Sequence, residues 1–501
     1  MLNMSAKSIA AKIYARLVYK SIRRDALRSI ECQDAVMHSL LKQGSKTAFG
    51  VDFHMHDVHD YTQWKQALPI VEYESLLPYI ERAKVGERDV LWPGRPKYFC
   101  KTSGTTSGTK YIPLTSDSMP NHIGTARNAL LSYIAETGHS EFTSGKMIFL
   151  QGSPKLDLLP SGIPYGRLSG IVANHVPAYL QKNRMPSYET NCIEDWEEKV
   201  NRIADETLHE RMTLISGIPN WVQMYFELLL RKSGKQTIRE IFPDFDLFVY
   251  GGVNFEPYRA KFEQLIGRRI PVIELYPASE GFIAFQDTQE ADGLLLNTNS
   301  GIFFEFIPAD EYFNECPTRL SLRDVKVGVN YALVLSNNAG LWGYSIGDTI
   351  KFTSLFPHRI KVTGRIKHFT SAFGEHVIAE EVEGSMKEAC EMLGIRVTEF
   401  HVAPQVAPAH GLPYHEWFIE TDETIGEDKR LQLASLLDAS MQRRNIYYRD
   451  LIQGNVLRPA VLTFVRSGAF NDYMRSVGKL GGQNKVPRLA NDRGIADGLS
   501  S

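Results

Sequence analysis

Apolar residues in the first 45 positions recur at steps of three and four, and no proline interrupts them. This spacing is typical of an amphipathic helix, so we expect residues 1–45 to be helical. Ile9, Ile13, Val18 and Ile22 would lie near one face of that helix. The many basic residues of this stretch also fit a transit peptide, but the helix is the favoured interpretation.

Farther along the chain, short apolar runs alternate with stretches that have helical spacing. Residues 145–153, 246–252 and 271–276 predict short buried strands, and 257–267 predicts a helix. This alternation is typical of an α/β sheet. The most apolar window, 212–230, contains proline and several polar side chains, so it predicts a buried loop and helix and not a membrane span.

The pattern changes to closely spaced strands over 301–363 and changes again after Gly364 and Arg365. The remaining chain predicts its own set of elements: a helix over 380–392 and strands near 396–403 and 415–421. A segment with its own helix and strands can form a separate core. We therefore predict two domains, over residues 1–363 and 364–501.

Composition and charge exclude some classes of protein. The 501 residues are 43% hydrophobic and 23% charged, which excludes intrinsic disorder for most of the chain. The formal net charge of −2 gives no argument for nucleic acid or a stable membrane association. The cysteines are scattered, without a Cys-x-x-Cys pair, which fits a reducing, cytoplasmic location. They are Cys32, Cys100, Cys192, Cys316 and Cys390.

Residues 101–110 read Lys-Thr-Ser-Gly-Thr-Thr-Ser-Gly-Thr-Lys. Glycine lets backbone amides approach an anion, hydroxyls donate hydrogen bonds, and lysine adds positive charge, so the segment suits a phosphate. It is not a Walker A loop, because Thr109 separates the second glycine from the lysine. The alternative is a surface loop rich in serine and threonine. The candidate phosphate-binding residues are Ser103, Gly104, Thr105, Thr106, Ser107, Gly108 and Lys110.

Two carboxylates follow predicted strands, where ligands bind in α/β sheets. Glu280 lies in Tyr-Pro-Ala-Ser-Glu-Gly, residues 276–281, and could hold a Mg²⁺ ion that bridges phosphate oxygens. Asp348 follows Gly347 and could accept hydrogen bonds from a ribose diol. Taken alone, Glu280 is more often a solvated turn residue, whereas Asp348 could equally be part of an Asx turn.

A basic, glycine-rich segment, Gly-Lys-Leu-Gly-Gly-Gln-Asn-Lys-Val-Pro-Arg, lies near the C-terminus at 478–488. A lysine on a mobile loop can enter and leave a phosphate site. Lys485 and Lys479 are both candidates, and a flexible tail with solvated charges is the alternative interpretation.

The order of these motifs resembles the adenylate-forming superfamily of acyl-CoA ligases, luciferases and peptide synthetase adenylation domains. One branch is more similar, the auxin-responsive Gretchen Hagen family of acyl-acid amido synthetases. The stretches that carry this closer resemblance are 303–308, 322–331, 337–344, 465–470 and 483–488. The resemblance extends from about Ala48 to Arg488.

The resemblance implies a large N-terminal α/β domain, with β-sheets flanked by helices, and a smaller, mobile C-terminal α+β domain. It implies that ATP adenylates a carboxylic acid and that an amine, typically an amino acid, then displaces AMP. Glu280 would hold Mg²⁺, Lys485 is favoured over Lys479 as the catalytic lysine, and the hinge would lie at Gly364 to Lys367. The implied ATP-binding residues outside the hydroxyl loop are Gly251, Gly252, Tyr276, Ser279, Tyr344, Asp348 and Arg365.

Some features depart from the plant members of this family. Gly343 and Tyr344 stand where a tyrosine-arginine pair is common, and 373–378 is more similar to acyl-CoA ligases. We therefore expect a bacterial-type relative whose acid need not be an auxin. An acyl-CoA ligase and a nucleotide-binding protein without turnover are the alternatives. Arg127 and Trp221 are weak substrate-site candidates, and a monomer or homodimer is expected.

Overall fold

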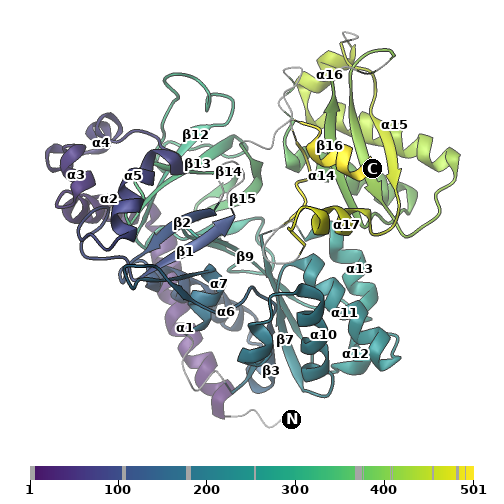
Figure 1. Cartoon of the computed structure of the whole chain (residues 1–501), viewed down its shortest axis with the longest axis horizontal. Coiled ribbons are helices and arrows are strands. Elements are labelled where there is room, and N and C mark those ends of the chain that lie inside the picture. The colour runs from purple at the N-terminus through teal and green to yellow at the C-terminus, as the bar shows by residue number, and fades with distance from the viewer. Residues whose placement is uncertain are drawn as a thin grey trace. The chain divides into compact units, whose positions relative to one another are not determined.

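The computed structural model describes residues 6–103, 109–175, 182–252, 255–366, 375, 377–406, 408, 410–453, 456–480, 485–490 and 492–500. The chain divides into two compact units (Figure 1). The first contains Met1–Asn254, Lys261–Ile346 and Lys351–Lys361. The second contains Phe255–Ala260, Gly347–Ile350 and Val362–Ser501, so short pieces of the earlier sequence belong to it.

Strands and helices alternate through most of the first unit, as the sequence predicts. The helices that begin in the sequence before residue 270 are α1 (Ala6–Leu27), α2 (Ser29–Gly44), α3 (Ala48–Asp52), α4 (Tyr61–Ala67), α5 (Tyr73–Lys84), α6 (Met119–Thr137), α7 (Leu168–Ala173), α9 (Tyr188–Asn191), α10 (Trp196–Thr207), α11 (Pro219–Ser233), α12 (Ile238–Ile241) and α13 (Glu256–Ile266), with 3-10 turns at Met55–Asp57 and Glu141–Ser144. The strands that begin before residue 360 are β1 (Tyr98–Ser103), β2 (Thr109–Leu114), β3 (Lys146–Phe149), β4 (Asp157–Leu158), β5 (Pro164–Gly166), β6 (Arg184–Met185), β7 (Met212–Ser216), β8 (Leu247–Gly251), β9 (Val272–Ala278), β10 (Gly281–Phe285), β11 (Leu294–Leu296), β12 (Ile302–Pro308), β13 (Asn330–Asn337), β14 (Tyr344–Leu355) and β15 (His358–Arg365).

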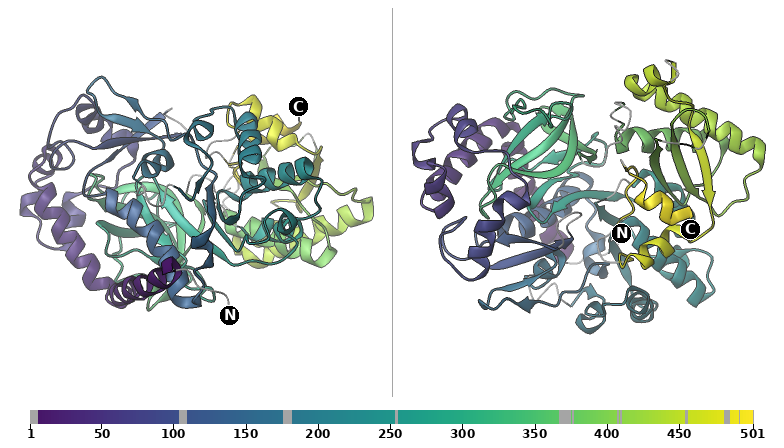
Figure 2. Two further views of the ribbon diagram at one scale, coloured as in Figure 1. Left: turned by 90° about the horizontal axis from the view of Figure 1, so that it is seen from below. Right: turned by 45° about the horizontal axis from the view of Figure 1, so that its top comes forward.

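One mixed sheet organises this part of the chain. Its order is β12-β13-β14-β15-β11-β10-β9-β8-β7-β3-β6. Strands β6, β3, β7, β8 and β9 run parallel, and β10 pairs with β9 in the antiparallel sense. Helix α6 packs against β9 and β10 with α1 lying on it, while α10, α11 and α12 gather beside β7 (Figures 1 and 2). The predicted α/β sheet is confirmed.

The apolar window at 212–230 corrects one expectation. It contains the buried strand β7 followed by helix α11, where we expected a loop and a helix. Helix α11 begins with Pro219 in its first turn and ends at Ser233, followed by Gly234 as the capping residue, whose φ is +69°. Proline fits the first helical turn because the amide it lacks would be unpaired there, and glycine tolerates the left-handed conformation that ends a helix.

The N-terminal helix is also divided, contrary to the expectation of one helical stretch with a common apolar face. Arg28 adopts φ −120° and ψ 33°, which separates α1 from α2. Ile9 and Ile13 are 47% and 59% exposed, whereas Val18 and Ile22 pack against the buried core. These four residues therefore do not share a face.

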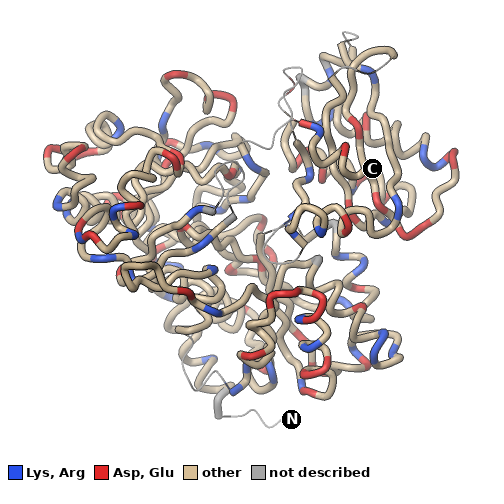
Figure 3. The backbone as a smooth tube through the Cα atoms, viewed as in Figure 1, with Lys and Arg blue, Asp and Glu red and all other residues tan. Residues whose placement is uncertain are grey.

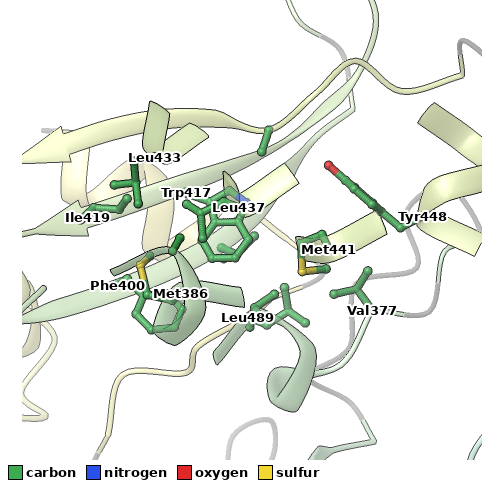
Figure 4. Close-up of a cluster of buried hydrophobic side chains, with 14 of the residues drawn as sticks. Val377, Met386, Phe400, Trp417, Ile419, Leu433, Leu437, Met441, Tyr448 and Leu489 are labelled. Carbon is green, nitrogen blue, oxygen red and sulfur yellow. The ribbon is translucent and has the colours of Figure 1, made fainter. Parts of the chain in front are cut away.

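The second unit has a three-stranded sheet and a core of its own. Its later elements are α14 (Ala379–Leu393), β16 (Glu399–Gln405), β17 (Tyr414–Glu420), α15 (Glu427–Arg444), α16 (Ile446–Gln453), β18 (Val461–Val465), α17 (Ala469–Ser476) and α18 (Gly494–Ser500). The sheet order is β16-β17-β18. Trp417 lies among apolar residues of the helices and strands, with Phe400 stacked 6.0 Å from it (Figure 4).

Basic and acidic residues are interspersed along the backbone of both units (Figure 3). Among the described residues, no helix is long and apolar enough to cross a bilayer.

Candidate active site

The hydroxyl-rich segment lies at the end of an antiparallel hairpin. Strands β1 and β2 pair so that Ser103 faces Thr109 and Thr102 faces Lys110. Gly104, Thr105, Thr106, Ser107 and Gly108 fall outside the described residues, as does the side chain of Ser103. The described strands therefore place both ends of the candidate phosphate loop side by side.

Tyr73 of α5 supports the lysine at the end of this hairpin. The Lys110 ammonium lies 5.3 Å from the centre of the Tyr73 ring, a cation–π arrangement. The Tyr73 hydroxyl accepts a hydrogen bond of 2.9 Å from the amide of Tyr111. Sequence reasoning missed Tyr73, because no motif links it to the loop.

The second motif occupies the turn that joins β9 to β10. Strand β9 continues to Ala278, so Tyr276 lies within the strand and is buried, and Ser279 and Glu280 form the turn. The Cys100 thiol donates a hydrogen bond of 3.2 Å to the Ser279 hydroxyl, and Cys100 belongs to β1. The structure therefore brings the hydroxyl-rich hairpin and the Ser279–Glu280 turn together.

Two glycines lie at the end of β8, which pairs with the same strand β9. Gly251 pairs with Leu275, and a Cβ atom on Gly251 would come 2.5 Å from the Leu275 carbonyl oxygen. Gly252 follows with a φ of +82°, a conformation that side chains rarely adopt. Glycine is required here for close backbone packing at the carboxyl end of a parallel strand, the edge at which α/β sheets bind ligands.

Tyr344 begins β14 and is buried. Its phenol has a pKa well above the ordinary value, because of burial first and the nearby Glu280 carboxylate second. Tyr73 and Glu74 act on Tyr344 in the same direction. Lys110, Tyr73, Tyr344 and Glu280 thus form one continuous neighbourhood of the first unit.

Asp348, Arg365 and Lys485 meet in the second unit. The Arg365 guanidinium pairs with the Asp348 carboxylate at 2.9 Å. The Lys485 ammonium interacts electrostatically with both of these residues and with Glu383. Desolvation by surrounding atoms is the main reason that the pKa of Lys485 is lowered to about 8; Asp348 and Glu383 oppose this effect, whereas Arg365 adds to it.

The polypeptide just after Lys485 is firmly attached to β16. Arg488 pairs with Glu383 at 3.4 Å and also with Glu399. The backbone amide of Val402 donates to the Arg488 carbonyl oxygen at 2.9 Å. Lys479, by contrast, is exposed just beyond α17, where its amide donates to the Met474 carbonyl oxygen at 2.7 Å.

Three further candidates have simple surroundings. Arg127 is exposed on α6, with its guanidinium 3.5 Å from the Asn128 side-chain oxygen. Trp221 is buried in α11 and packs on Trp196 with ring centres 4.6 Å apart. Gly364 has a φ of +154° and lies close to Ala379. Lys367, the other hinge candidate, falls outside the described residues.

Family models match the chain over most of its length. The description "GH3 family N-terminal domain" matches residues 18–190 and 168–272, the central domain matches 295–365, and the C-terminal domain matches 380–494. Indole-3-acetic acid-amido synthetase GH3.3 of Arabidopsis thaliana is 21% identical, covering 94% of this chain and 91% of the relative. Jasmonoyl-L-amino acid synthetase JAR4 of Nicotiana attenuata is 22% identical, covering 91% and 90%.

Solved structures share the fold. AtGH3.15 acyl acid amido synthetase in complex with 2,4-DB matches with a TM-score of 0.80 at 16% identity, covering 97% of this chain and 96% of that one. A 2-hydroxyisobutyryl-CoA ligase in the postadenylation state matches with a TM-score of 0.57 at 12% identity, covering 95% and 91%. The predicted adenylate-forming fold is confirmed.

Proposed function

The chain belongs to the GH3 family of acyl-acid amido synthetases, and on this premise we propose that it joins a carboxylic acid to an amine, typically an amino acid, with ATP as the co-substrate. In the first half-reaction an acid oxygen attacks the α-phosphorus of ATP, and the bond to pyrophosphate breaks. In the second, the amine nitrogen attacks the acyl carbon of the adenylate, AMP leaves, and the nitrogen loses a proton.

The first unit supplies groups suited to the triphosphate. Phosphoryl transfer depends mainly on positioning and charge stabilisation, so the site mainly needs hydrogen-bond donors and positive charge around the phosphates. We assign the hydroxyl-rich loop and Lys110 to the β- and γ-phosphates, and Ser279 to the α-phosphate. The hydrogen bond between Cys100 and Ser279 supports this assignment, because it joins the hairpin to the turn.

Glu280 suits a Mg²⁺ ion that is shared with phosphate oxygens. Among the described residues, no three His, Cys, Asp or Glu side chains gather in a group that could hold a metal. Mg²⁺ in nucleotide enzymes is commonly bound by one or two carboxylates together with substrate phosphates, so a single carboxylate beside the predicted phosphate site fits. When bound, the ion would neutralise phosphate charge.

The second unit supplies groups suited to the nucleoside and to the developing charge. We assign Asp348 to the ribose hydroxyls, with Arg365 holding its carboxylate in place. We assign Lys485 to the acid oxygen and the α-phosphate, where its protonated ammonium would stabilise negative charge as the new bond forms. The common neighbourhood of Asp348, Arg365 and Lys485 favours Lys485 over Lys479.

The proposal rests chiefly on one observation. In a chain of this family, the hydrogen bond between Cys100 and Ser279 places the hydroxyl-rich hairpin beside the Ser279–Glu280 turn. The purified protein is incubated with ATP, Mg²⁺, pooled carboxylic acids and pooled amino acids, and products are identified by mass spectrometry. We expect a new mass equal to one acid plus one amino acid minus water, with AMP in equal amount. An acid-dependent product that requires coenzyme A would instead identify a thioester ligase.

A further inference from the structure

Buried side chains from three separate elements contact the segment from Ser279 to Phe282. Cys100 of β1 contacts the Ser279 hydroxyl, Asn337 of β13 contacts Glu280, and Asn121 of α6 contacts Phe282. Short turns between antiparallel strands have few interactions of their own. These contacts therefore fix a segment whose position the strands alone do not fully determine.

Asn337 uses both ends of its amide. Its Nδ2 donates a hydrogen bond of 2.6 Å to the Glu280 carbonyl oxygen. Its Oδ1 accepts bonds of 3.0 Å each from the amides of Ala339 and Leu341. The side chain is only 1% exposed, so a lost partner would be costly to leave unsatisfied. Asparagine satisfies this position because one group must donate and the other must accept.

Asn121 holds the next stretch of the same segment. Its Oδ1 accepts a 2.7 Å bond from the Phe282 amide, and its Nδ2 donates to the Phe282 carbonyl oxygen at 3.2 Å and to the Ser300 hydroxyl at 2.9 Å. Gly281 lies between the two fixed points, and a Cβ atom on it would come 2.4 Å from the Ile302 side chain. The backbone on the C-terminal side of Glu280 is therefore closely confined.

We propose that Asn337 and Asn121 are positioning residues that aim the Glu280 carboxylate at Mg²⁺ bound to the ATP phosphates. This inference rests on the proposed function. Groups that orient a metal ligand without touching the metal typically change metal affinity by about 10- to 100-fold when they are replaced. Asn337 acts on the Glu280 carbonyl oxygen, and Asn121 acts on the backbone of Phe282, two residues farther along.

Asn337→Asp isolates the bond to Glu280. The substitution keeps an oxygen for the Ala339 and Leu341 amides but sets a second oxygen against the Glu280 carbonyl, so the donor is lost and the contact becomes repulsive. The neighbouring Asn338→Asp is the matched control, because Asn338 donates at 2.8 Å to the Asp117 carbonyl oxygen instead. Both variants make the same change from asparagine to aspartate, one residue apart.

Two readouts are measured across a Mg²⁺ titration. The first is acid-dependent pyrophosphate release, and the second is the rise in melting temperature that Mg²⁺ causes in the presence of ATP without any acid. For Asn337→Asp we expect the Mg²⁺ midpoint of both curves to rise by about tenfold or more, with most of the maximal rate recovered at saturating Mg²⁺. Asn338→Asp is expected to keep the wild-type midpoint.

A role limited to folding would lower the rate of Asn337→Asp equally at every Mg²⁺ concentration, and an unchanged midpoint would overturn the proposal. If Asn337→Asp does not fold, Asn121→Asp takes its place: it keeps the acceptor for the Phe282 amide and loses the donor, and the same comparison of midpoints applies. A wild-type protein that releases no pyrophosphate with any acid contradicts the proposed function alone, because the thermal titration still decides whether the asparagines set Mg²⁺ affinity.

Discussion

Arg488→Met tests whether the segment after Lys485 is anchored by buried charge. The methionine keeps much of the apolar length of arginine but removes the partner of two carboxylates. The Arg488, Glu383 and Glu399 side chains are 10%, 16% and 15% exposed. Breaking a buried ion pair from one side typically costs about 3–5 kcal/mol, because a charge is left uncompensated. Arg475→Met is the control, since Arg475 and Asp472 are 53% and 42% exposed and such pairs contribute about 0–1 kcal/mol.

Native-state hydrogen exchange measures the effect within the second unit. Since 1.4 kcal/mol corresponds to a factor of ten, we expect protection of the β16 amides, including Val402, to fall by about 10²-fold or more in Arg488→Met. Arg475→Met should lower the same protection by less than about tenfold. Acid-dependent pyrophosphate release should fall only in Arg488→Met, because Lys485 lies three residues before the anchor. Equal protection losses in the two variants would refute the reasoning.

Three further predictions concern the lysines and the cysteines. Lys485→Ala should reduce acid-dependent pyrophosphate release by about 10²-fold or more, as expected for a group that stabilises transition-state charge, while Lys479→Ala should leave it near the wild-type rate; the reverse order would assign catalysis to Lys479. Because the pKa of Lys485 is lowered to about 8 and its protonated form carries the charge, the rate should fall as pH rises through about 8, and Lys485→Arg should remove that fall from any residual activity. Burial raises the pKa of Cys100 to about 12, so a thiol reagent at neutral pH should modify exposed Cys316 in the native protein and leave Cys100 intact; peptide mapping by mass spectrometry would show early labelling of Cys100 if this is wrong.

Local patterns in the sequence were sufficient for many elements. The apolar run at 246–252 forms β8, and the helix expected over 380–392 is α14, Ala379–Leu393. Such elements are predictable because hydrophobic spacing and glycine or proline at the ends are local properties. The order of the motifs carried the family resemblance in the same way, and the family models confirm it.

The contacts that shape the site were not predictable from local patterns. Cys100 and Ser279 are 179 positions apart, and Asn337 is 57 positions from Glu280, so only the folded sheet brings them together. The N-terminal helix shows the same limit. At about 100° per residue, Ile9 and Ile13 lie on the opposite side of α1 from Val18 and Ile22. Packing on α6 decides that the side with Val18 and Ile22 faces inward, so Ile13 remains exposed.

The central claim is that the acid is activated as an acyl-adenylate, and the fate of its oxygen tests this most directly. An acid labelled with oxygen-18 in its carboxylate is converted with ATP and an amino acid, and the nucleotide and phosphate products are analysed by mass spectrometry. Attack on the α-phosphorus transfers one acid oxygen to the nucleotide, so we expect AMP that carries one oxygen-18 atom for each amide formed. ADP with the label in inorganic phosphate, or AMP without label, would contradict the account.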